Sequence, residues 1–236
     1  MKIDDYAQYF TPEIMMGPNS MRLLGELLEH TPDGLRGRVL DLGCGRGLTT
    51  LLLAKETCAD TIYATDLWIP ARENYALFQQ WGIDDRAVPM HANALDLPYA
   101  DGFFDAMVSV DAYHYFGCAD ALFADKFLPL LKPGATALLA MPGFTREPTE
   151  ADRALLNEWA EDEAYMFRTA AWWKEHIAQN CADRIEVEAW EAREFRRSWQ
   201  DWIDSGHEFA RRDAEFLRRG LWDCSCFVML KVTKRA

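Results

Sequence analysis

The stretch VLDLGCGRGL at residues 39–48 decides how this chain of 236 residues folds. A short, mostly apolar run over 38–42 is long enough for one buried strand, and three glycines at alternate positions follow it. Residues 49–56 then begin with a leucine-rich run that indicates a helix. Glycine permits the tight turn and lets the backbone approach a ligand closely. This order of strand, turn and helix predicts a nucleotide-binding corner, with free N–H groups at the helix N-terminus.

The spacing of the glycines indicates which nucleotide is bound. A dinucleotide fingerprint is G-x-G-x-x-G/A, whereas here Gly43, Gly45 and Gly47 alternate and Leu48 follows them. Asp41 also ends the strand, beside the place where a pyrophosphate would lie. A carboxylate there repels phosphate but suits a ligand that carries an ammonium group. S-adenosylmethionine (SAM) has that ammonium group and no phosphate, so the pattern favours SAM.

Four motifs in order carry a resemblance to a known family. The run DLGCGRG at 41–47 resembles motif I of the class I SAM-dependent methyltransferases. The run ATD at 64–66 ends a second strand in an acid, and LKPG stands at 131–134. NALDLPYADGFFD at 93–105 is similar to the G-D-A-x-x-L-P-F-x-D-x-x-F-D run of small-molecule methyltransferases such as those of quinone biosynthesis, of the methyltransferase domain 11 type. A glycine-rich turn without a ligand would explain the first motif only.

The resemblance implies an α/β fold, a Rossmann-like doubly wound sheet with helices on both faces. It implies seven strands in the order 3-2-1-4-5-7-6, with strand 7 antiparallel. The chain is expected to be a single SAM-dependent methyltransferase domain over 1–236, with helical lid insertions at approximately 1–20, 144–167 and 192–222. A helix is expected over about 119–131, before the LKPG turn.

The cofactor site is expected at the ends of the first strands. Asp66 stands 25 residues after Asp41, where an acid accepts the ribose hydroxyls; the alternative is a helix N-cap. Leu67 follows and could lie against adenine. Asn93 holds the place of an aspartate that accepts from the adenine amino group, and its amide oxygen can accept without charge assistance, unless it is only a turn residue. The complete set expected to contact SAM is Asp41, Gly43, Cys44, Gly45, Asp66, Leu67, Asn93, Ala94 and Asp111.

Catalytic candidates follow the predicted strand over 105–110. The run from Asp111 to Phe116 leaves the carboxyl end of this strand, where ligands bind in open α/β sheets. His114 is the candidate base, with Tyr113 and Tyr115 as positioning residues. The alternative is that all three are packing residues, because methyl transfer is an in-line displacement that mainly needs alignment.

The charge and composition of the chain limit the kinds of molecule that it is expected to bind. The net charge is −13 and the pI is near 4.8, which disfavours nucleic acid and anionic membranes. No apolar run approaches the roughly 18 residues that a span needs, and the first residues have no signal-peptide pattern, so we expect a cytoplasmic protein. The six cysteines show no zinc spacing, so no metal site is expected. Nothing indicates an oligomeric state.

The expected function is methyl transfer to a small molecule by a SAM-dependent transferase. The chain has nine tryptophans, and rings that line a pocket would suit a planar or cationic acceptor, which points to an amine or an aromatic compound. Arginines within 193–219 are expected to pair with the acidic segment 158–163, or else to recognise an anionic substrate group. A non-catalytic SAM-binding module stays open as an alternative, as does a nicotinamide-dependent oxidoreductase, which Asp41 and Leu48 disfavour.

Overall fold

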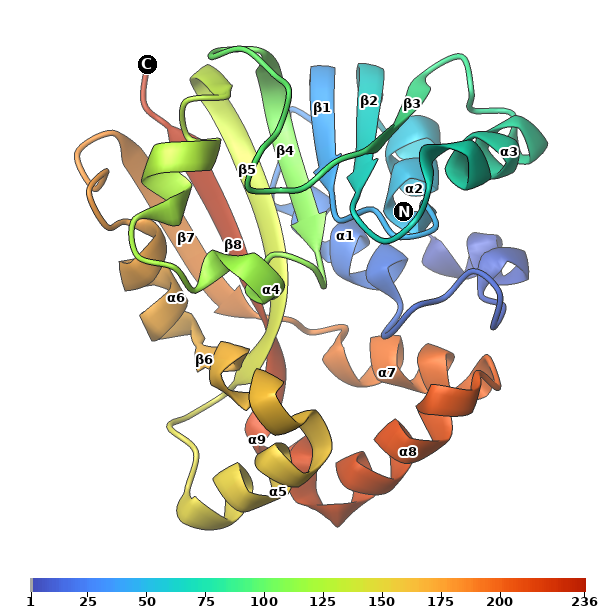
Figure 1. Cartoon of the computed structure of the whole chain (residues 1–236), viewed down its shortest axis with the longest axis vertical. Helices are drawn as coiled ribbons and strands as arrows, with labels where there is room; N and C mark the ends of the chain where they lie inside the picture. The colour runs from blue at the N-terminus through green and yellow to red at the C-terminus, as the bar shows by residue number, and fades with distance from the viewer. Residues whose placement is uncertain (1) are drawn as a thin grey trace.

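A twisted mixed sheet forms the centre of the computed structural model, which describes residues 2–236. Its strands follow the spatial order β3-β2-β1-β4-β5-β8-β7, and the short β6 pairs with β5 outside that path (Figure 1). The strands are β1 (Arg36–Leu42), β2 (Cys58–Asp66), β3 (Ala87–His91), β4 (Phe104–Val110), β5 (Leu131–Phe144), β6 (Arg168–Thr169), β7 (Ile185–Glu191) and β8 (Ser225–Lys234).

This topology confirms the predicted doubly wound sheet. The last strand, β8, runs antiparallel to both β5 and β7, while the pairs from β3 to β5 are parallel. The numbers differ from the expected 3-2-1-4-5-7-6 only because the two residues of β6 add one strand to the count. All parallel strands therefore direct their carboxyl ends to one edge of the sheet, which is the edge where ligands bind in such folds.

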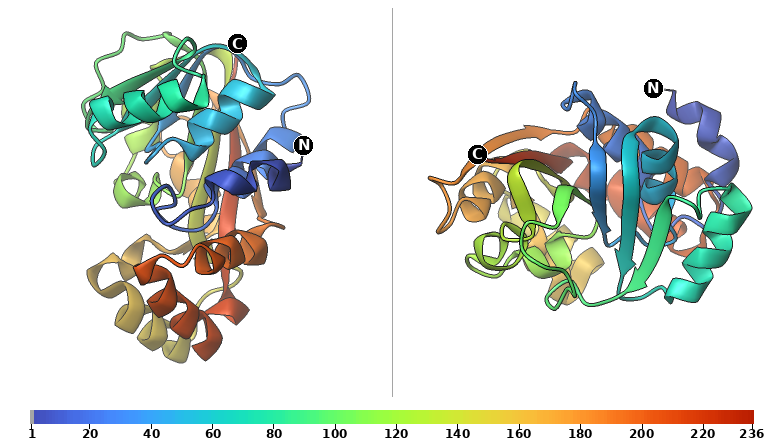
Figure 2. Two further views of the ribbon diagram at one scale, coloured as in Figure 1. Left: turned by 90° about the vertical axis from the view of Figure 1, so that its right-hand side faces the viewer. Right: turned by 90° about the horizontal axis from the view of Figure 1, so that it is seen from above.

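Helices cover both faces of the sheet, as two views from different sides show (Figure 2). Strand side chains alternate between the faces, so Val39 packs into one hydrophobic core and its neighbour Leu40 into the other. The first core contains α1 (Ser20–Glu29), α2 (Leu48–Glu56) and α3 (Ala71–Trp81). The second contains α6 (Ala170–Ile177) and the segment around η2 (Phe123–Phe127), while α4 (His114–Gly117) follows β4.

A helical layer lies beyond the carboxyl ends of the strands, at the bottom of Figure 1. Its core continues that of α1 and α2, because Leu156, Trp199 and Phe216 belong to the same buried cluster. At the N-terminus, η1 (Ile3–Tyr9) packs near α1. The layer consists of α5 (Glu150–Ala160), η3 (Glu161–Met166), α7 (Phe195–Asp204), α8 (Glu208–Phe216), η4 (Leu217–Leu221) and α9 (Trp222–Cys224).

Ion pairs join the parts of this layer. Arg219 makes two hydrogen bonds to the Glu158 carboxylate, at 2.7 and 2.6 Å, and so links η4 to α5. Arg212 lies 3.7 Å from Glu161. These contacts agree with the interpretation that the arginines pair with the acidic segment. Arg197 instead pairs with Asp4 of η1 at 2.7 Å, which ties α7 to the N-terminal segment.

The helix expected over 119–131 is wrong. The structure has a turn and the five-residue π-helix η2 in its place. Ala121 adopts a left-handed conformation with φ of 56°, and its N–H donates to the Gln179 side chain at 3.0 Å. A left-handed residue ends regular helix geometry, so a tertiary contact overrides the local preference. Among the described residues, no helix is long and apolar enough to cross a membrane.

Candidate functional site

The glycine loop after β1 is held in place by the neighbouring strand. The backbone N–H groups of Gly43 and Cys44 both donate to the Thr65 carbonyl, at 2.8 and 3.2 Å. Gly43 has a φ of +73°, and a Cβ there would lie 2.2 Å from Cβ of Ala112. Only glycine fits this position, because the turn requires a left-handed backbone and the start of the β4 loop packs directly against it.

A cavity of about 370 Å³ opens beside this loop, within the range of roughly 300–1,000 Å³ typical of ligand pockets. The structure brings to its wall every residue predicted to contact SAM except Asp41. The predicted residues that line it are Gly43, Cys44, Gly45, Asp66, Leu67, Asn93, Ala94 and Asp111. The cavity thus spans the carboxyl ends of β1, β2, β3 and β4, as expected for a nucleoside ligand in this fold.

Asp41 lies behind the cavity wall, with 1% of its surface exposed. Its Oδ2 accepts hydrogen bonds from the hydroxyls of Thr49 and Thr50, at 2.8 and 2.6 Å. Its Oδ1 is buried, and no donor among residues 2–236 reaches it. Burial raises the pKa of Asp41 to about 6. The carboxylate therefore places a negative charge beneath the glycine loop, and direct contact with an ammonium group stays a prediction.

Asp66 connects the glycine loop to the turn after β2. Its Oδ2 accepts from the Gly45 N–H at 2.9 Å, while its Oδ1 accepts from the N–H groups of Trp68 and Ile69 at 2.7 and 2.9 Å. The turn-capping role considered as the alternative is thus present. Each carboxylate oxygen has a further lone pair, and Asp66 lines the cavity, so the ribose role stays a prediction.

Asn93 shows the turn role that was its alternative. Its Oδ1 accepts from the Leu95 N–H at 2.9 Å, so the oxygen assigned to adenine is engaged in a local turn. Leu67 and Trp68 stand at the cavity mouth, 52% and 61% exposed. The Trp68 ring meets the Tyr115 ring edge-on at 5.2 Å. These exposed apolar groups form a surface on which an adenine ring can stack.

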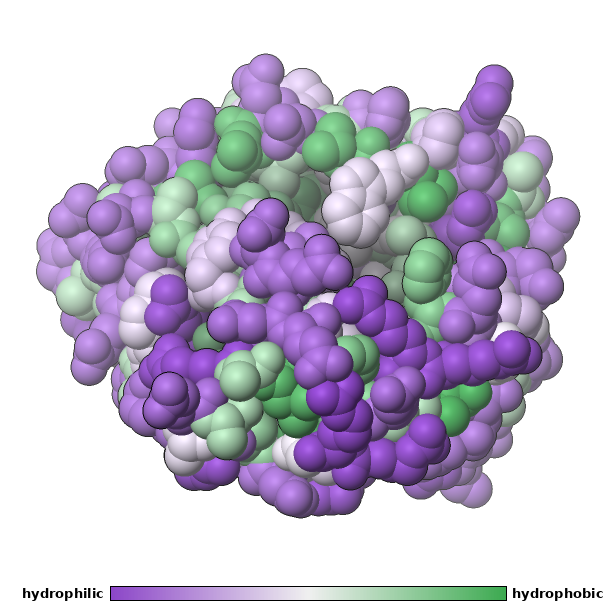
Figure 3. All heavy atoms as spheres, turned by 60° about the horizontal axis from the view of Figure 1, so that its bottom comes forward, coloured by the Kyte–Doolittle hydropathy of each residue, from purple (hydrophilic) through white to green (hydrophobic). Residues whose placement is uncertain are grey.

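A second cavity, of about 350 Å³, lies between the sheet and the helical layer. It shares Asp111, Tyr115 and the loop 16–18 with the first cavity, so the two meet at the carboxyl end of β4. Figure 3 shows this side of the molecule, where hydrophobic and intermediate side chains gather around a hollow. Its remaining lining consists of His114, Pro142, Trp159, Ala160, Glu163, Phe167, Trp199, Trp202, His207, Phe209, Arg212 and Asp213.

The three catalytic candidates, Tyr113, His114 and Tyr115, face different parts of the structure. His114 lines the second cavity and Tyr115 lines both, whereas Tyr113 lines neither. Tyr113 is fully buried, and its ring packs against Phe127 and Trp173 at 5.6 and 5.9 Å. The structure therefore does not bring Tyr113 to the site. Successive residues of a helical turn point about 100° apart, so neighbours in the sequence face different sides.

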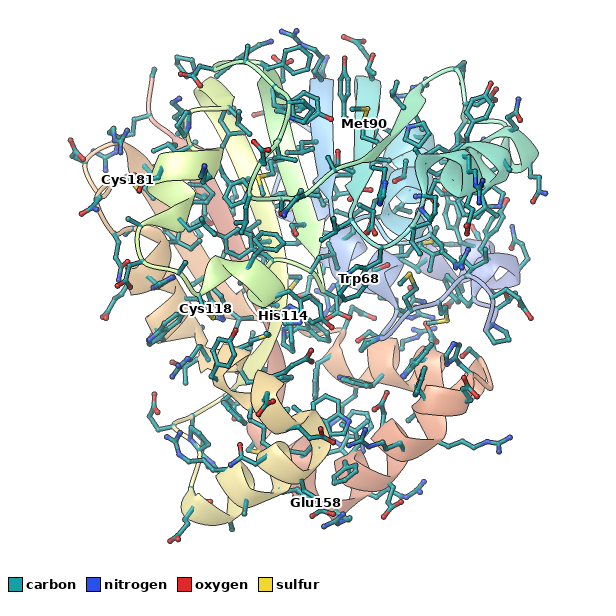
Figure 4. The ribbon with its side chains drawn as sticks, viewed as in Figure 1. Trp68, Met90, His114, Cys118, Glu158 and Cys181 are labelled. Atoms are coloured by element: carbon teal, nitrogen blue, oxygen red, sulfur yellow. The ribbon has the colours of Figure 1, made fainter. Side chains whose placement is uncertain are left out.

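His114 lies between the strand ends and the helical layer, as does Trp68 (Figure 4). The imidazole is 5% exposed, and its Nδ1 is buried without a hydrogen-bond partner among the described residues. Burial lowers the pKa of His114 to about 3, so the ring is neutral near pH 7. Burial, together with the Asp111 carboxylate, also raises the pKa of Tyr115.

Residues from the helical layer complete the second cavity. The Asp213 carboxylate accepts from the indole N–H groups of Trp159 and Trp202, at 2.8 and 2.7 Å, so one side chain of α8 fixes a ring of α5 and a ring of α7. Sequence analysis expected tryptophan rings to line a pocket but did not single out Trp159 or Asp213. Their only signal was the presence of many aromatic residues after 141, because the contacts join positions more than 50 residues apart.

Comparison with known proteins agrees with this arrangement. Residues 39–134 match the sequence pattern of a family described as a methyltransferase domain. The chain is 30% identical over 98 residues to 27-O-demethylrifamycin SV methyltransferase of Amycolatopsis mediterranei, covering 40% of this chain and 35% of the relative. The chain thus spans about a third of the length of that relative.

Solved structures share the fold at low identity. Phosphoethanolamine N-methyltransferase 2 of Haemonchus contortus, in complex with SAM, superposes with a TM-score of 0.73 at 17% identity, over 94% of this chain and 54% of that one. A SAM-dependent methyltransferase of Geobacter sulfurreducens, in complex with S-adenosylhomocysteine, gives 0.68 at 15% identity over 98% of both chains. Its motifs, its fold and these matches thus all liken the chain to the class I SAM-dependent methyltransferases, with residues 39–134 as the matched methyltransferase domain.

Proposed function

We propose that this chain transfers a methyl group from SAM to a small-molecule acceptor, and that the acceptor is an amine or an aromatic compound. The observation that carries the proposal is the pair of cavities that meet at the carboxyl end of β4. One is lined by the glycine loop and the ends of the first strands. The other is lined by aromatic and acidic side chains of the helical layer. A donor and an acceptor bound side by side need little more than alignment and exclusion of water.

In the first cavity, the chain's own residues would hold the cofactor as follows. Asp66 would accept from the ribose, while Leu67 and Asn93 would flank the adenine. The backbone of Gly43 and Gly45 would lie along the methionine part, with the Asp41 charge beneath the loop. When bound, SAM supplies an activated methyl group, so the residues around it need only bind and orient the two molecules.

The lining of the second cavity supports an amine or an aromatic acceptor. Rings of Trp159, Trp199 and Trp202 lie on one side, and the carboxylates of Glu163 and Asp213 accompany them. An aromatic face attracts a cation within about 6 Å, and stacks on a planar ring equally well. The similarity to a phosphoethanolamine N-methyltransferase agrees with a nitrogen acceptor. His114 and Tyr115 would position the acceptor.

We further propose that the segments 2–20, 144–167 and 192–222 act as a lid; residue 1 of the expected segment lies outside the described residues. Gly17 and Pro18 come from the first segment, Trp159 from the second and Trp202 from the third, and all four line the second cavity. A cover assembled from three segments can open for the acceptor and close to exclude water.

The test is a screen of purified protein with SAM and four acceptors that share a benzyl group: benzylamine, benzyl alcohol, benzyl mercaptan and phenylacetic acid. We expect S-adenosylhomocysteine to form with the amine, and Asp66→Ala to raise the KM for SAM. Asp60→Ala is the matched control, because it changes an exposed aspartate at the other end of β2. Tight SAM binding without turnover of any acceptor would favour the non-catalytic module, and NADH binding in place of SAM would favour the oxidoreductase.

A further inference from the structure

Asp111 lies where the two cavities meet. It is the first residue after β4, and its backbone N–H donates to the Ala140 carbonyl at 2.8 Å, which continues the parallel pairing with β5. The residue then turns sharply, with a φ of 56° that non-glycine residues rarely adopt. This turn brings the side chain to the wall of both the cofactor cavity and the second cavity.

No hydrogen-bond donor among residues 2–236 reaches the Asp111 carboxylate, which is partly exposed where the two cavities meet. It packs against the N-terminal loop so closely that a Cβ on Gly17 would lie 2.9 Å from its Oδ2. Burial, with Asp213 as a second cause, raises the pKa of Asp111 to about 8. A ligand that fills the cavities would cover this carboxylate, so a cationic group placed beside it would replace the lost water with an ion pair.

The charged groups around Asp111 do not supply that cation. In the second cavity Glu163 and Asp213 are acidic, and Arg212 is directed to Glu161 and to the carbonyls of Glu158 and Trp159. His207 accepts a hydrogen bond at Nδ1 from the Phe209 N–H. In the first cavity Arg46 pairs with Glu73 at 3.4 Å, and Asp66 is acidic. The remaining titratable neighbours are His114 and Tyr115, both neutral at pH 7 by the direction of their pKa values.

We propose that Asp111 binds the ammonium group of the acceptor and takes one proton from it, so that this site methylates a primary or secondary amine. The inference rests on the proposed function and names its substrate class and its proton acceptor. An Asp111 oxygen receives an N–H proton and leaves a neutral amine. The nitrogen lone pair then forms the new C–N bond as the C–S bond breaks, with that electron pair passing to sulfur. The products are the methylated ammonium ion and S-adenosylhomocysteine, and Asp111 releases its proton to water.

Asp111 suits this step better than His114 does. His114 lines the second cavity alone, whereas Asp111 also borders the space where the activated methyl group must lie. A proton acceptor is most effective when its pKa approaches the working pH. Asp111 meets that condition and the buried imidazole does not. His114 therefore contributes shape and orientation to the cavity.

The surrounding indoles serve the same ligand. Each oxygen of the Asp213 carboxylate accepts a hydrogen bond from one indole, Oδ1 from Trp159 and Oδ2 from Trp202. Asp213 is therefore less available than Asp111 to bind the ammonium group of a ligand. Asp111 thus keeps its oxygens free inside a cavity lined with rings, whereas Glu163, the other carboxylate of that lining without a partner among residues 2–236, is exposed to solvent. Asp213 is a positioning residue in this scheme, because it acts through the tryptophans.

The experiment compares the full-length wild type with Asp111→Asn, because asparagine has the same shape and also tolerates a left-handed backbone. SAM binding is measured by calorimetry, and kcat/KM for benzylamine is followed from pH 6 to 10. We expect kcat/KM to fall at least about 100-fold in the variant, as is typical when a proton acceptor is lost. We also expect the acidic limb that Asp111 sets to be lost, which leaves only the limb at higher pH that the titration of benzylamine itself sets. In the wild type, the positive charge of bound SAM favours the ionised Asp111 carboxylate and so lowers its pKa. The acidic limb that Asp111 sets is therefore expected below pH 8.

His114→Ala is the comparison variant, and it should keep the acidic limb with less than about a tenfold loss. Benzyltrimethylammonium, which carries a charge but no proton, should bind wild type and bind Asp111→Asn more weakly, so the anchoring role is measured without turnover. An Asp111→Asn enzyme with an unchanged limb and unchanged cation binding would overturn the inference. Turnover of benzyl alcohol or benzyl mercaptan alone would overturn the substrate class while leaving methyl transfer intact, and no turnover of any acceptor would remove the proposed function itself.

Discussion

Gly43 shows how a single residue shapes the loop that lines the first cavity. Its left-handed backbone is one constraint, and the neighbouring Ala112 is a second, since an added Cβ would meet the Ala112 Cβ at 2.2 Å. Gly82 provides the matched case, because it has a φ of +61° with open space around it. Substituting alanine at each position separates two effects on stability. Gly82 reports the cost of the left-handed backbone alone, and Gly43 adds the cost of the clash with Ala112.

Gly43→Ala should therefore destabilise the protein more than Gly82→Ala does. Both variants pay roughly 1–2 kcal/mol for a left-handed alanine. Gly43→Ala adds overpacking, typically about 1–3 kcal/mol, and should also weaken SAM binding. Urea unfolding and calorimetry measure the two effects. An equal loss of unfolding free energy in the two variants would show that the loop after β4 shifts at little cost. That result would contradict the close packing of Ala112 against Gly43.

Asp66 is the second residue at which a single substitution has a predicted effect, in this case on SAM affinity. Asp66→Ala removes the proposed ribose contacts and three hydrogen bonds to backbone N–H groups, so SAM affinity should fall by about 2–3 kcal/mol. Asp66→Asn keeps an oxygen that can accept from the N–H groups of Trp68 and Ile69. Its SAM affinity should therefore lie between that of the wild type and that of Asp66→Ala. Calorimetry that finds unchanged SAM affinity in the alanine variant would overturn the ribose assignment.

The helical elements over the second cavity are joined by a few specific contacts. The Asp213 carboxylate links α5, α7 and α8 through two indoles, and Arg219 links η4 to Glu158. Arg22 of α1 is buried and pairs with Asp4 at 2.7 Å and with Asp201, which attaches the layer to the sheet domain. Contacts of this kind can be broken and remade together when a lid opens.

Limited proteolysis should detect the lid. We expect the first cuts in the segments 2–20, 144–167 and 192–222, and slower cutting when S-adenosylhomocysteine and benzylamine are both present. Asp213→Asn should speed cleavage, because an amide can accept at one position only and leaves one indole without its partner. Asp204→Asn is the control, since the side chain of that exposed residue of α7 accepts from Gln200 and from no other side chain among residues 2–236. Identical cleavage with and without ligands would argue against a moving lid.

The charge of the whole molecule makes its stability depend on pH in two windows. Asp41 and Asp111 have pKa values raised by burial, to about 6 and about 8, above the unfolded value near 3.9. The folded state then binds more protons than the unfolded state, so these two groups make stability fall as pH rises from about 4 to about 8. Ion-paired Asp152 and Glu158 have lowered pKa values, and their contribution is lost only in acid, below about pH 4.

Asp111→Asn should therefore be more stable than wild type at pH 8, with a difference that shrinks toward pH 5. The reason is that asparagine removes a charge whose pKa is raised in the folded state, where the carboxylate is less well hydrated than in the unfolded chain. Thermal unfolding at a series of pH values measures this, with Asp60→Asn, an exposed position, as control. A constant difference across pH would mean that the Asp111 carboxyl does not titrate in the window from 4 to 8.

The sequence alone determined the fold and predicted most of the residues that line the first cavity, because both depend on local order. A strand, a glycine turn and a helix occupy consecutive positions, and parallel strands place their carboxyl ends at one edge. Gly43, Asp66 and Asn93 could be assigned to that edge without knowing any distance. The sequence did not separate a ligand role from a turn role at Asp66 and Asn93, and the structure shows that both side chains cap turns.

Only the tertiary structure decided the second cavity and the side chains that face it. Its wall joins the loop at 16–18 with residues after β4 and with three helices, and no local pattern encodes contacts over such separations. It also decided that Tyr113 enters the core while Tyr115 lines the cavities, and that Asp41 lies behind the loop. Packing against distant residues set these orientations, which is why the unpartnered carboxylate of Asp111 became visible only once the chain was folded.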